Sequence, residues 1–220
     1  MGTLAREAID KTAGMQYVGG FARSRVPDLY IDDDLERMLH ERRPEVLVDF
    51  TPRPTTQTVA RTAAEREVAL VIGSSEWNHD ERNALDDVAL KHGVGALVVP
   101  NFALGAVLMM RFAEQAAKYF PSVEIIEMHR EEKRDKPSGT ARSTAERITA
   151  GGGPNDVPVH SVRMRGLLAH QAVLLGNTGE LLTIRHDSYS RDSFAAGILF
   201  AIEAVRNVRG VRYGLDSVLQ

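Results

Sequence analysis

The sequence predicts an α/β fold in which a Rossmann-like parallel sheet is followed by a second α+β domain. Three observations lead to this prediction. In the first half, short continuous apolar runs alternate with helical patterns, which is typical of a parallel sheet covered on both faces. In the second half, segments of alternating apolar and polar residues follow one another without intervening helices. A long apolar helix then comes near the end.

The first half contains the expected strands of the parallel sheet and the helices that follow them. The strands are expected at residues 15–21, 46–50, 68–72 and 96–99. The helices are expected at residues 35–42, 55–66, 80–92 and 105–119. Most of these strands are short and continuously apolar, so helices are needed on both faces of the sheet to bury them.

The second half changes character after an expected helix at residues 140–150. Three segments then alternate apolar and polar residues, at residues 158–165, 169–175 and 180–186. Without helices between them, these segments predict an antiparallel or mixed sheet, with a turn at residues 177–179. The last helix is expected at residues 192–208, with Gly210 as its C-terminal stop.

The composition excludes several classes of protein. The 30 acidic residues outnumber the 27 lysines and arginines, and the resulting net charge of −3 argues against a general nucleic-acid binder. The absence of cysteine excludes disulfides and thiolate metal sites and fits a reducing cytoplasm. No apolar run approaches the roughly 20 residues of a membrane span, and the histidines show no metal-ligand spacing. We therefore expect a cytoplasmic protein without a metal, nucleic-acid or membrane partner.

Small and polar residues follow three of the expected strands in the first half. These segments are Asp49-Phe50-Thr51, Gly73-Ser74-Ser75 and Pro100-Asn101-Phe102. In open α/β sheets, ligands bind outside the carboxyl ends of the strands. We therefore expect the three segments to border a ligand-binding cleft.

Residues 127–141 carry the strongest indication of chemistry. His129 follows an apolar run, Lys133 lies four residues later, and Ser138 opens the expected helix. A helix N-terminus offers unpaired N–H groups and the positive end of a dipole, so it attracts carboxylates. On residue type alone, His129 would be a structural histidine and Lys133 a solvated loop residue. Together with the helix N-terminus, however, they indicate an anionic substrate and a reaction that involves proton transfer.

These residues resemble the 4-hydroxy-tetrahydrodipicolinate reductase family, also called dihydrodipicolinate reductases, of bacterial lysine biosynthesis. The resemblance covers nearly the whole chain. Its most specific part is Glu127-Met128-His129, through Lys133, to Pro137-Ser138-Gly139-Thr140-Ala141. Supporting segments are residues 48–51, 100–105, 183–191 and 213–215.

The resemblance implies a domain organisation, a reaction and an assembly. Residues 1–101 and 192–220 are expected to form a dinucleotide-binding domain, and residues 102–191 a domain for substrate binding and oligomerisation into a homotetramer. With NADPH or NADH as cofactor, such an oxidoreductase reduces 4-hydroxy-tetrahydrodipicolinate, a small cyclic dicarboxylate, to tetrahydrodipicolinate. The product feeds lysine (diaminopimelate) biosynthesis.

The resemblance also implies roles for individual residues. His129 matches the catalytic histidine of the family and Lys133 its catalytic lysine, and which of the two donates the proton stays open. Ser138, Gly139 and Thr140 match the loop that holds a substrate carboxylate. The residues expected to bind the cofactor are Gly2, Arg23, Phe50, Thr51, Gly73, Ser74, Ser75, Pro100, Asn101 and Phe102.

Three departures from the family pattern bear on substrate and cofactor. Arg130 stands where the family has a second histidine, so it is expected to bind a carboxylate but cannot donate a proton at neutral pH. The Gly-Thr-Thr-Gly turn that lies beside the nicotinamide appears as residues 73–76. Ala22 aligns with the acidic residue that holds the adenosine ribose, and Arg23 and Arg25 follow it, which favours the 2′-phosphate of NADPH.

The chain starts in a segment that resembles the helix after the first Rossmann strand. Gly2 aligns with the end of the family's glycine motif, so we expect the first strand and most of the glycine-rich turn to be missing. Weak dinucleotide binding would follow. A second function therefore stays open, that of a catalytically impaired remnant or paralogue that keeps the oligomerising substrate domain. A third is a related oxidoreductase acting on another small dicarboxylate, which Arg130 suggests.

Overall fold

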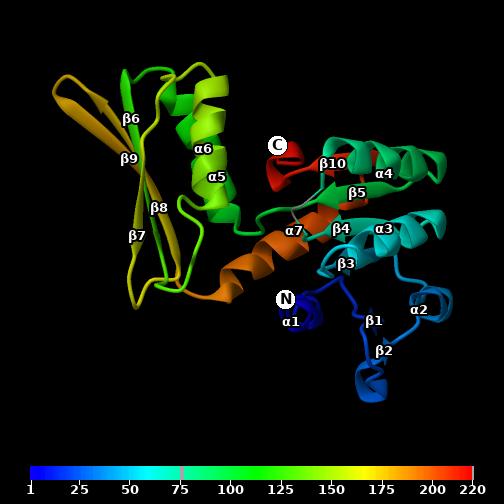
Figure 1. The fold of residues 1–220 in the computed structure, drawn as a ribbon. Coiled ribbons are helices and arrows are strands. Elements are labelled where there is room, and N and C mark those ends of the chain that lie inside the picture. Colours follow the sequence, from blue (N-terminus) through cyan, green and yellow to red (C-terminus); the bar gives the residue numbers. More distant parts are fainter. Residues whose placement is uncertain (75–76, 220) are drawn as a thin grey trace. The chain divides into compact units, whose positions relative to one another are not determined.

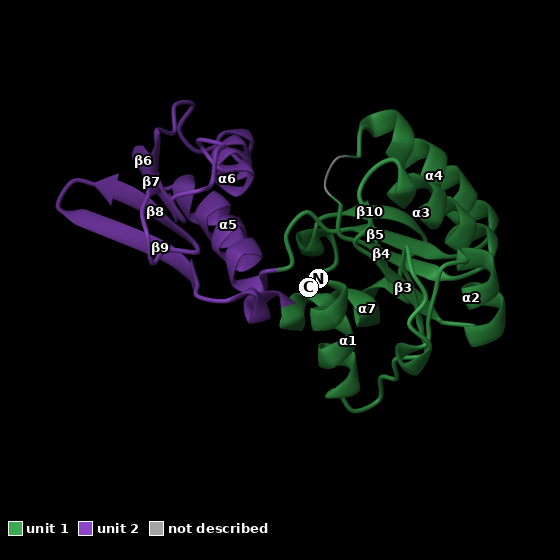
Figure 2. Cartoon of the chain, turned by 60° about the horizontal axis from the view of Figure 1, so that its bottom comes forward, with its two compact units in different colours: residues 1–102, 195–220 green, residues 103–194 purple. Residues whose placement is uncertain are grey.

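The computed structural model describes residues 1–74 and 77–219, and the chain divides into two compact units (Figure 2). The first unit comprises Met1–Phe102 with Ala195–Gln220, and the second comprises Ala103–Phe194. The boundaries expected from the sequence, after residues 101 and 191, lie one and three residues before the boundaries of these units. Ser75, one of the expected cofactor residues, lies outside the described residues.

A parallel sheet forms the centre of the first unit. Among the described residues its strands follow the order β10-β5-β4-β3. Their bounds are β3 Val46–Asp49, β4 Ala69–Ile72, β5 Gly95–Val98 and β10 Gly210–Tyr213. Every residue of β4 and β5 is buried, because helices cover both faces of the sheet, as the continuous apolar runs predict.

The helices of the first unit pack on both sides of this sheet (Figure 1). α3 (Thr55–Glu65) and α4 (His79–Lys91) lie on one face, because right-handed crossovers between strands that step in one direction put both helices on the same side. α7 (Ala195–Val205) packs on the other face, and α1 (Gly2–Asp10) packs against α7. α2 (Leu35–Arg42) contacts α3.

The segment expected as a strand at residues 15–21 is a strand only at its end. β1 (Gly20–Phe21) pairs in parallel with β2 (Ile31–Asp32), a strand that the sequence pattern did not predict. Among the described residues these two strands form a small sheet of their own. A strand extends only as far as its hydrogen-bonding partner, and β2 is two residues long. The prediction for residues 15–19 was therefore wrong.

The C-terminal helix differs from the expectation at both ends. A 3-10 helix occupies Arg191–Phe194, and α7 ends at Val205. Gly210 does not stop the helix but begins β10, which pairs with β5. It has φ +72°, and a Cβ at this position would collide with the Asp86 carboxylate, which accepts the Val211 N–H at 2.6 Å. This close approach, rather than a helix end, requires the glycine. Two further 3-10 helices lie at Pro27–Leu29 and Leu215–Ser217.

The second unit is built on a mixed sheet, as the alternating segments predict. The strand order is β7-β6-β8-β9, in which the β6–β7 pair is parallel and the other pairs are antiparallel. The strands are β6 Ser122–His129, β7 Val159–Arg163, β8 Ala169–Asn177 and β9 Glu180–Ser188. α5 (Leu104–Ala117) and α6 (Gly139–Ala150) pack side by side on one face (Figure 1).

The hairpin between β8 and β9 confirms the expected turn at residues 177–179. The side-chain oxygen of Asn177 accepts the Thr178 N–H at 2.7 Å, and Gly179 has φ +79°. Along the strands, alternate apolar residues such as Ile125 and Val173 face α5 and α6 and form the core of the unit. Among the described helices, none combines the length and the apolar character that a membrane span requires.

Candidate active site

Strand β6 places a carboxylate in the core of the second unit. Val123, Ile125 and Glu127 lie at alternate positions on the face that α5 and α6 cover, and the exposed fraction of Glu127 is 0 %. An unpaired charge in a protein core is strongly destabilising, so a buried carboxylate needs partners. Its two oxygens accept hydrogen bonds from His129, Ser138 and Arg163, and the Ser161 side chain also donates to this carboxylate.

His129 ends β6 and contacts this carboxylate. Its Nδ1 lies 2.5 Å from Oε2 of Glu127. The His129 side chain is 15 % exposed, so the ring is mostly buried but still reaches the surface. Its Nε2 has no hydrogen-bond partner among the described residues. An imidazole held at one nitrogen and accessible at the other is suited to proton transfer.

Arg163, at the end of β7, is the main partner of Glu127. Its Nη1 and Nη2 donate to Oε2 at 2.9 Å and to Oε1 at 2.7 Å, which is a bidentate pair. The same guanidinium donates from Nε to the carbonyl of Lys133 at 3.2 Å and from Nη2 to the carbonyl of Asp135 at 2.7 Å. The buried ion pair therefore ties the loop that carries Lys133 to the strand that carries His129.

Sequence reasoning did not single out Glu127 or Arg163 as site residues, although the alternation of their strands contains a signal. Glu127 occupies a core-facing position in β6. Arg163 lies two residues beyond Ser161 in β7 and pairs with His129 in the register of the two strands. A charged residue at a core-facing position is rarely left without a partner. That rule could have found the ion pair.

Lys133 and Arg130 lie in the loop after β6. Nζ of Lys133 is 2.8 Å from Oδ1 of Asp135, and the Lys133 side chain is 25 % exposed. Arg130 is exposed, and its Nε is 4.0 Å from the Glu132 carboxylate. Exposed ion pairs of this kind contribute at most about 1 kcal/mol. Either cation can therefore turn to a substrate carboxylate at small cost.

Ser138 caps α6 and is tied to the same buried carboxylate. Its Oγ accepts the Ala141 N–H at 3.2 Å, and its own N–H donates to Oε1 of Glu127 at 3.3 Å. The N–H groups of Gly139 and Thr140 have no acceptor among the described residues. A Cβ built on Gly139 would meet no atom within 4 Å, so the first turn of the helix is open. These amides and the helix dipole can bind an anion.

Burial and neighbouring charges set the protonation of Glu127 and His129. Burial acts to raise the pKa of Glu127, but hydrogen bonds from Arg163, Ser161 and His129 outweigh it and hold that pKa below its usual range. Burial lowers the pKa of His129, the Glu127 contact opposes this without reversing it, and the charges of Lys133 and Arg163 add to the lowering. At neutral pH the carboxylate is therefore ionised and the imidazole is neutral.

Three expected cofactor residues meet at the carboxyl ends of the strands in the first unit. The rings of Phe50 and Phe102 contact edge to face, with centroids 5.6 Å apart. A Cβ built on Gly73 would lie 2.5 Å from the Phe50 ring and 3.1 Å from the Phe102 ring. The two rings occupy the space that a side chain at position 73 would need, so this position requires glycine.

A chain of polar groups joins the ends of β3 and β4. The buried Asp49 carboxylate accepts the Thr51 N–H at 2.8 Å and the Thr56 hydroxyl at 2.6 Å. The Ser74 hydroxyl donates to Thr56 Oγ1 at 3.2 Å and accepts the indole N–H of Trp77 at 3.0 Å. Two expected cofactor residues, Thr51 and Ser74, are thereby held by one network. The buried Thr51 hydroxyl has no partner among the described residues, so it can serve a ligand.

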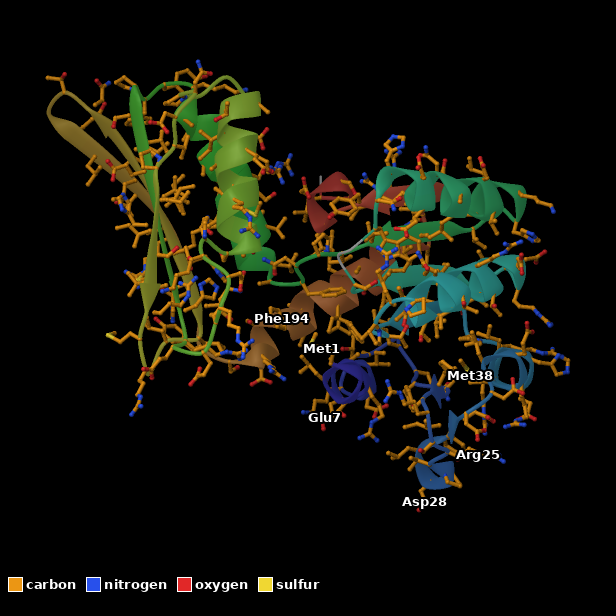
Figure 3. The ribbon with its side chains drawn as sticks, in the orientation of Figure 1. Met1, Glu7, Arg25, Asp28, Met38 and Phe194 are labelled. Carbon is orange, nitrogen blue, oxygen red and sulfur yellow. The ribbon has the colours of Figure 1, made fainter. Side chains whose placement is uncertain are left out.

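Four of the expected cofactor residues lie outside the two sets of contacts described above: Gly2, Arg23, Pro100 and Asn101. Gly2 is the first residue of α1, and Met1 is the N-cap of that helix (Figure 3). Pro100 is exposed and Asn101 is half-buried, and both lie between β5 and Phe102.

The arginines expected near the cofactor lie beyond β1. Arg23 is exposed and follows that strand after one residue. Arg25 lies near the 3-10 helix that contains Asp28 (Figure 3), and its Nη2 is 3.9 Å from the Asp32 carboxylate. The Asp32 carboxylate also accepts a hydrogen bond from Arg37 Nε at 2.9 Å. Arg37 is therefore the main partner of this carboxylate.

A cavity of about 230 Å³ lies between α3 and α4 in the first unit. Its described lining includes Trp77 and Glu81 but none of the residues expected to bind cofactor or substrate. Oε2 of Glu81 accepts the Asn78 N–H at 2.9 Å, so this carboxylate belongs to the cap of α4. We therefore do not assign the cavity to the reaction.

Two family models match the chain. The model described as "Dihydrodipicolinate reductase, N-terminus" matches residues 1–102, and that described as "Dihydrodipicolinate reductase, C-terminus" matches residues 105–219. The 4-hydroxy-tetrahydrodipicolinate reductase of Moorella thermoacetica is 44% identical over 209 residues, which cover 86% of this chain and 78% of that protein. The protein of the same name from Bacillus licheniformis is 37% identical over 251 residues, which cover 100% of this chain and 94% of that protein.

A solved structure agrees with these sequence matches. A dipicolinate-bound dihydrodipicolinate reductase from Paenisporosarcina sp. TG-14 superimposes with a TM-score of 0.90 at 35% identity, covering 99% of this chain and 95% of that one. The chain therefore belongs to the dihydrodipicolinate reductase family.

Proposed function

We propose that this chain catalyses the reduction of 4-hydroxy-tetrahydrodipicolinate to tetrahydrodipicolinate with NADPH or NADH, a step of lysine (diaminopimelate) biosynthesis. Two relatives named for this activity share 44% and 37% of their aligned residues with it. One structural observation carries the proposal. A single buried carboxylate, that of Glu127, contacts both His129 and the backbone of Ser138. A proton-transfer group and an anion-binding helix end are therefore held next to each other.

The second unit supplies groups for both carboxylates of the substrate. The free amides of Gly139 and Thr140 can bind one carboxylate at the N-terminus of α6. Lys133 and Arg130 can pair with the other, because both lie in the loop that Arg163 anchors. The similar structure from Paenisporosarcina binds dipicolinate, which is also a dicarboxylate.

Proton transfer completes the reduction. Hydride addition to the unsaturated ring leaves an electron pair that must take up a proton, and loss of water gives the product. Nε2 of His129 and Nζ of Lys133 are the two groups that can deliver the proton. A positioned general acid contributes about 10²–10⁴-fold in rate. His129 is neutral when no substrate is bound, so it must gain a proton before it can act as the acid.

The carboxyl ends of β3, β4 and β5 fit a nicotinamide cofactor. The buried Thr51 hydroxyl offers an unused hydrogen-bonding group. Gly73 lets the backbone after β4 pack directly on Phe50 and Phe102, which fixes the edge that a flat ring would contact. When bound, the reduced nicotinamide supplies the hydride. Arg23 supports a preference for NADPH, because an arginine suits a 2′-phosphate.

The assembly that we propose is a homotetramer formed through the second unit. The face of its sheet opposite α5 and α6 carries half-buried Ile126 and Met128 and exposed Val162 and Leu181. An exposed apolar surface of this kind is typical of a protein–protein contact. The family resemblance points to a second copy of the chain as the occupant. Light scattering should give about four times the 24.2 kDa of one chain. A monomer at micromolar concentration would contradict the assembly.

A coupled assay tests the activity. The preceding synthase generates the substrate, and the absorbance of NADPH or NADH reports its reduction. The chain should turn over. His129→Gln should lower kcat by about 10²-fold or more, because a proton-transfer group is lost. Lys133→Ala should mainly raise KM, because a carboxylate partner is lost. Lys136→Ala, an exposed lysine of the same loop, is the matched control and should leave both constants nearly unchanged.

The same assay separates the other two functions. Failure to turn over, together with binding of dipicolinate by calorimetry, would favour the catalytically impaired paralogue. Turnover with a different small dicarboxylate, and none with the expected substrate, would favour the related oxidoreductase. If both His129→Gln and Lys133→Ala retain full kcat and KM, the proposed site is wrong.

A further inference from the structure

We propose that Glu127 is a positioning residue, which together with Arg163 holds the His129 ring with its Nδ1–H toward the carboxylate and its Nε2 toward the substrate. The inference rests on the proposed role of His129 and adds to it two residues that never need to touch the substrate. It specifies which nitrogen of the ring transfers the proton.

The hydrogen bonds around Glu127 determine the tautomer of His129. Arg163 donates to both carboxylate oxygens, at 2.9 and 2.7 Å, so Glu127 is the acceptor on each side. The backbone N–H of Ser138 donates to Oε1 at 3.3 Å. An ionised carboxylate has no proton to give. The contact of 2.5 Å between Oε2 and His129 Nδ1 therefore requires the proton on Nδ1, and the neutral ring keeps its lone pair on Nε2.

Burial prevents this arrangement from relaxing. The side chain of Glu127 is completely buried, and that of Arg163 is 6 % exposed. If Glu127 turned away from His129, it would also break a bidentate pair with a buried guanidinium. The orientation of the imidazole is therefore fixed before the substrate binds, which reduces the reorganisation needed for proton transfer.

The same guanidinium also sets the position of Lys133. Its Nε donates to the Lys133 carbonyl at 3.2 Å, and its Nη2 donates to the Asp135 carbonyl at 2.7 Å. Lys133 Nζ in turn lies 2.8 Å from Oδ1 of Asp135. One ion pair therefore fixes the imidazole on β6 and the loop that presents the ammonium group. This positioning role explains why the core holds a charged pair, although apolar residues of similar size would bury there with a smaller desolvation cost.

The charged groups that act on His129 give the inference a measurable consequence. Glu127 is the anion in contact with the ring, and Lys133 and Arg163 are the cations that act on it. If the carboxylate is replaced by an amide, only the cations remain. The pKa of His129 should then fall further, because a neighbouring positive charge disfavours the imidazolium.

Nuclear magnetic resonance of the intact protein labelled with ¹⁵N-histidine tests the tautomer without any assay of turnover. Above the pKa of His129, the inference expects the Nδ1-protonated form of that residue. The exposed His160, whose Nε2 lies 2.9 Å from the Glu124 carboxylate, is the internal reference. An Nε2-protonated His129 would overturn the inference. This result is independent of the substrate, so it stays informative even if the proposed function fails.

Two variants test the role in catalysis. Glu127→Gln should lower kcat by about 10- to 100-fold, the range seen when a carboxylate that orients a metal-binding histidine is lost, with KM changed by less than about threefold. The pKa of His129 should move to lower pH in the same variant. Glu127→Asp keeps the charge but shortens the side chain, so it should fold with Arg163 still paired. The pKa of His129 should then return toward that of the unchanged protein more fully than kcat does. Should Glu127→Gln fail to fold, Glu127→Asp alone must show the loss of kcat.

Glu114→Gln is the control for the loss of a carboxylate in this unit. Glu114 pairs with Arg147 between α5 and α6 at 2.9 Å, away from His129. Its kcat, KM and the pKa of His129 should match those of the unchanged protein. Equal losses of kcat in the Glu114 and Glu127 variants would show that only stability is at stake, and the positioning role would be wrong. An unchanged kcat in both Glu127 variants would be equally decisive against it.

Discussion

Phe50 and Phe102 meet edge to face, with ring centroids 5.6 Å apart and an interplanar angle of 64°, and together they fill the space beside Gly73. The three residues come from the ends of three different strands of one parallel sheet. Parallel strands bring their carboxyl ends to the same edge, so residues far apart in the chain become neighbours there.

Gly73→Ala tests this packing. The added Cβ would lie 2.5 Å from the Phe50 ring, so the rings or the backbone must move. Overpacking of this kind costs about 1–3 kcal/mol, and the shifted backbone should raise KM for NADPH. Urea unfolding and steady-state kinetics measure the two effects. Gly176→Ala is the control, because its Cβ would find its nearest neighbour at 3.9 Å. Equal stability of the two variants would contradict the argument.

Asp49→Asn tests the polar network under the same edge. The carboxylate accepts from Thr51 at 2.8 Å and from Thr56 at 2.6 Å, and an amide can accept at only one of these two places. A buried donor left without a partner costs about 1–3 kcal/mol. We expect a lower free energy of unfolding and a higher KM for the cofactor. Asp80→Asn, on the exposed first turn of α4, should leave KM unchanged and lower the free energy of unfolding by no more than about 1 kcal/mol. Wild-type stability of Asp49→Asn would refute the role of the network.

Arg23→Ala tests the preference for NADPH. If the guanidinium binds the 2′-phosphate, its removal should raise KM for NADPH about 10- to 100-fold, since a charge-assisted hydrogen bond contributes about 1.5–3 kcal/mol. KM for NADH should stay within about twofold, because NADH lacks this phosphate. Arg66→Ala, at the far end of α3, is the control arginine of the same unit. If the unchanged protein binds NADH as tightly as NADPH, the proposed preference for NADPH is wrong.

His186 should make stability depend on pH. Its ring packs against Gly105, and burial lowers its pKa, with Asp187 opposing the shift and His170 adding to it. Between the lowered pKa and about 6.5, the unfolded chain binds more protons than the folded one. The contribution of His186 to the free energy of unfolding should therefore increase with pH in this window. The same contribution is lost as pH falls through the pKa of His186 in the folded protein.

His186→Gln should reduce that rise, which urea unfolding between about pH 5 and 8 can measure. The control is His40→Gln, the same substitution at an exposed position in the last turn of α2. Some slope should remain in His186→Gln, because burial also lowers the pKa of His129. Identical slopes for the unchanged protein and His186→Gln would rule out this contribution.

Much of the secondary structure follows from local signals in the sequence. The helix expected at residues 35–42 is α2 (Leu35–Arg42), and the cap that starts it is the Asp34 side chain, which accepts the Arg37 N–H at 3.0 Å. The sequence likewise predicts β3, β4, β5, β7, β8 and β9, because the apolar patterns of these strands report how many of their faces are buried. β2, β6 and β10 were not predicted as strands. β2 has only two residues, and β10 is a strand because it pairs with the distant β5.

The active-site prediction divides in the same way. The expected His129, Lys133 and Ser138 lie within one short segment, and the chemistry of their side chains, together with the family resemblance of the segment, was enough to propose them. The alternation in β6 indicates that Glu127 faces the core, but local pattern does not identify its partner, because Arg163 is 36 positions away. Only the parallel pairing of β6 with β7 brings that guanidinium to the carboxylate.

The sequence by itself determined the two kinds of sheet, most helices and the family, and it led to the groups that we propose to bind a dicarboxylate and move a proton. The tertiary structure alone decided which of these groups are held and how. In the folded chain, Glu127 is buried and paired with Arg163, and Nδ1 of His129 contacts the Glu127 carboxylate. The rings of Phe50 and Phe102 pack against Gly73. The physical reason is that hydrogen bonds and burial depend on distances in space, which strand pairing sets between residues that the chain keeps far apart.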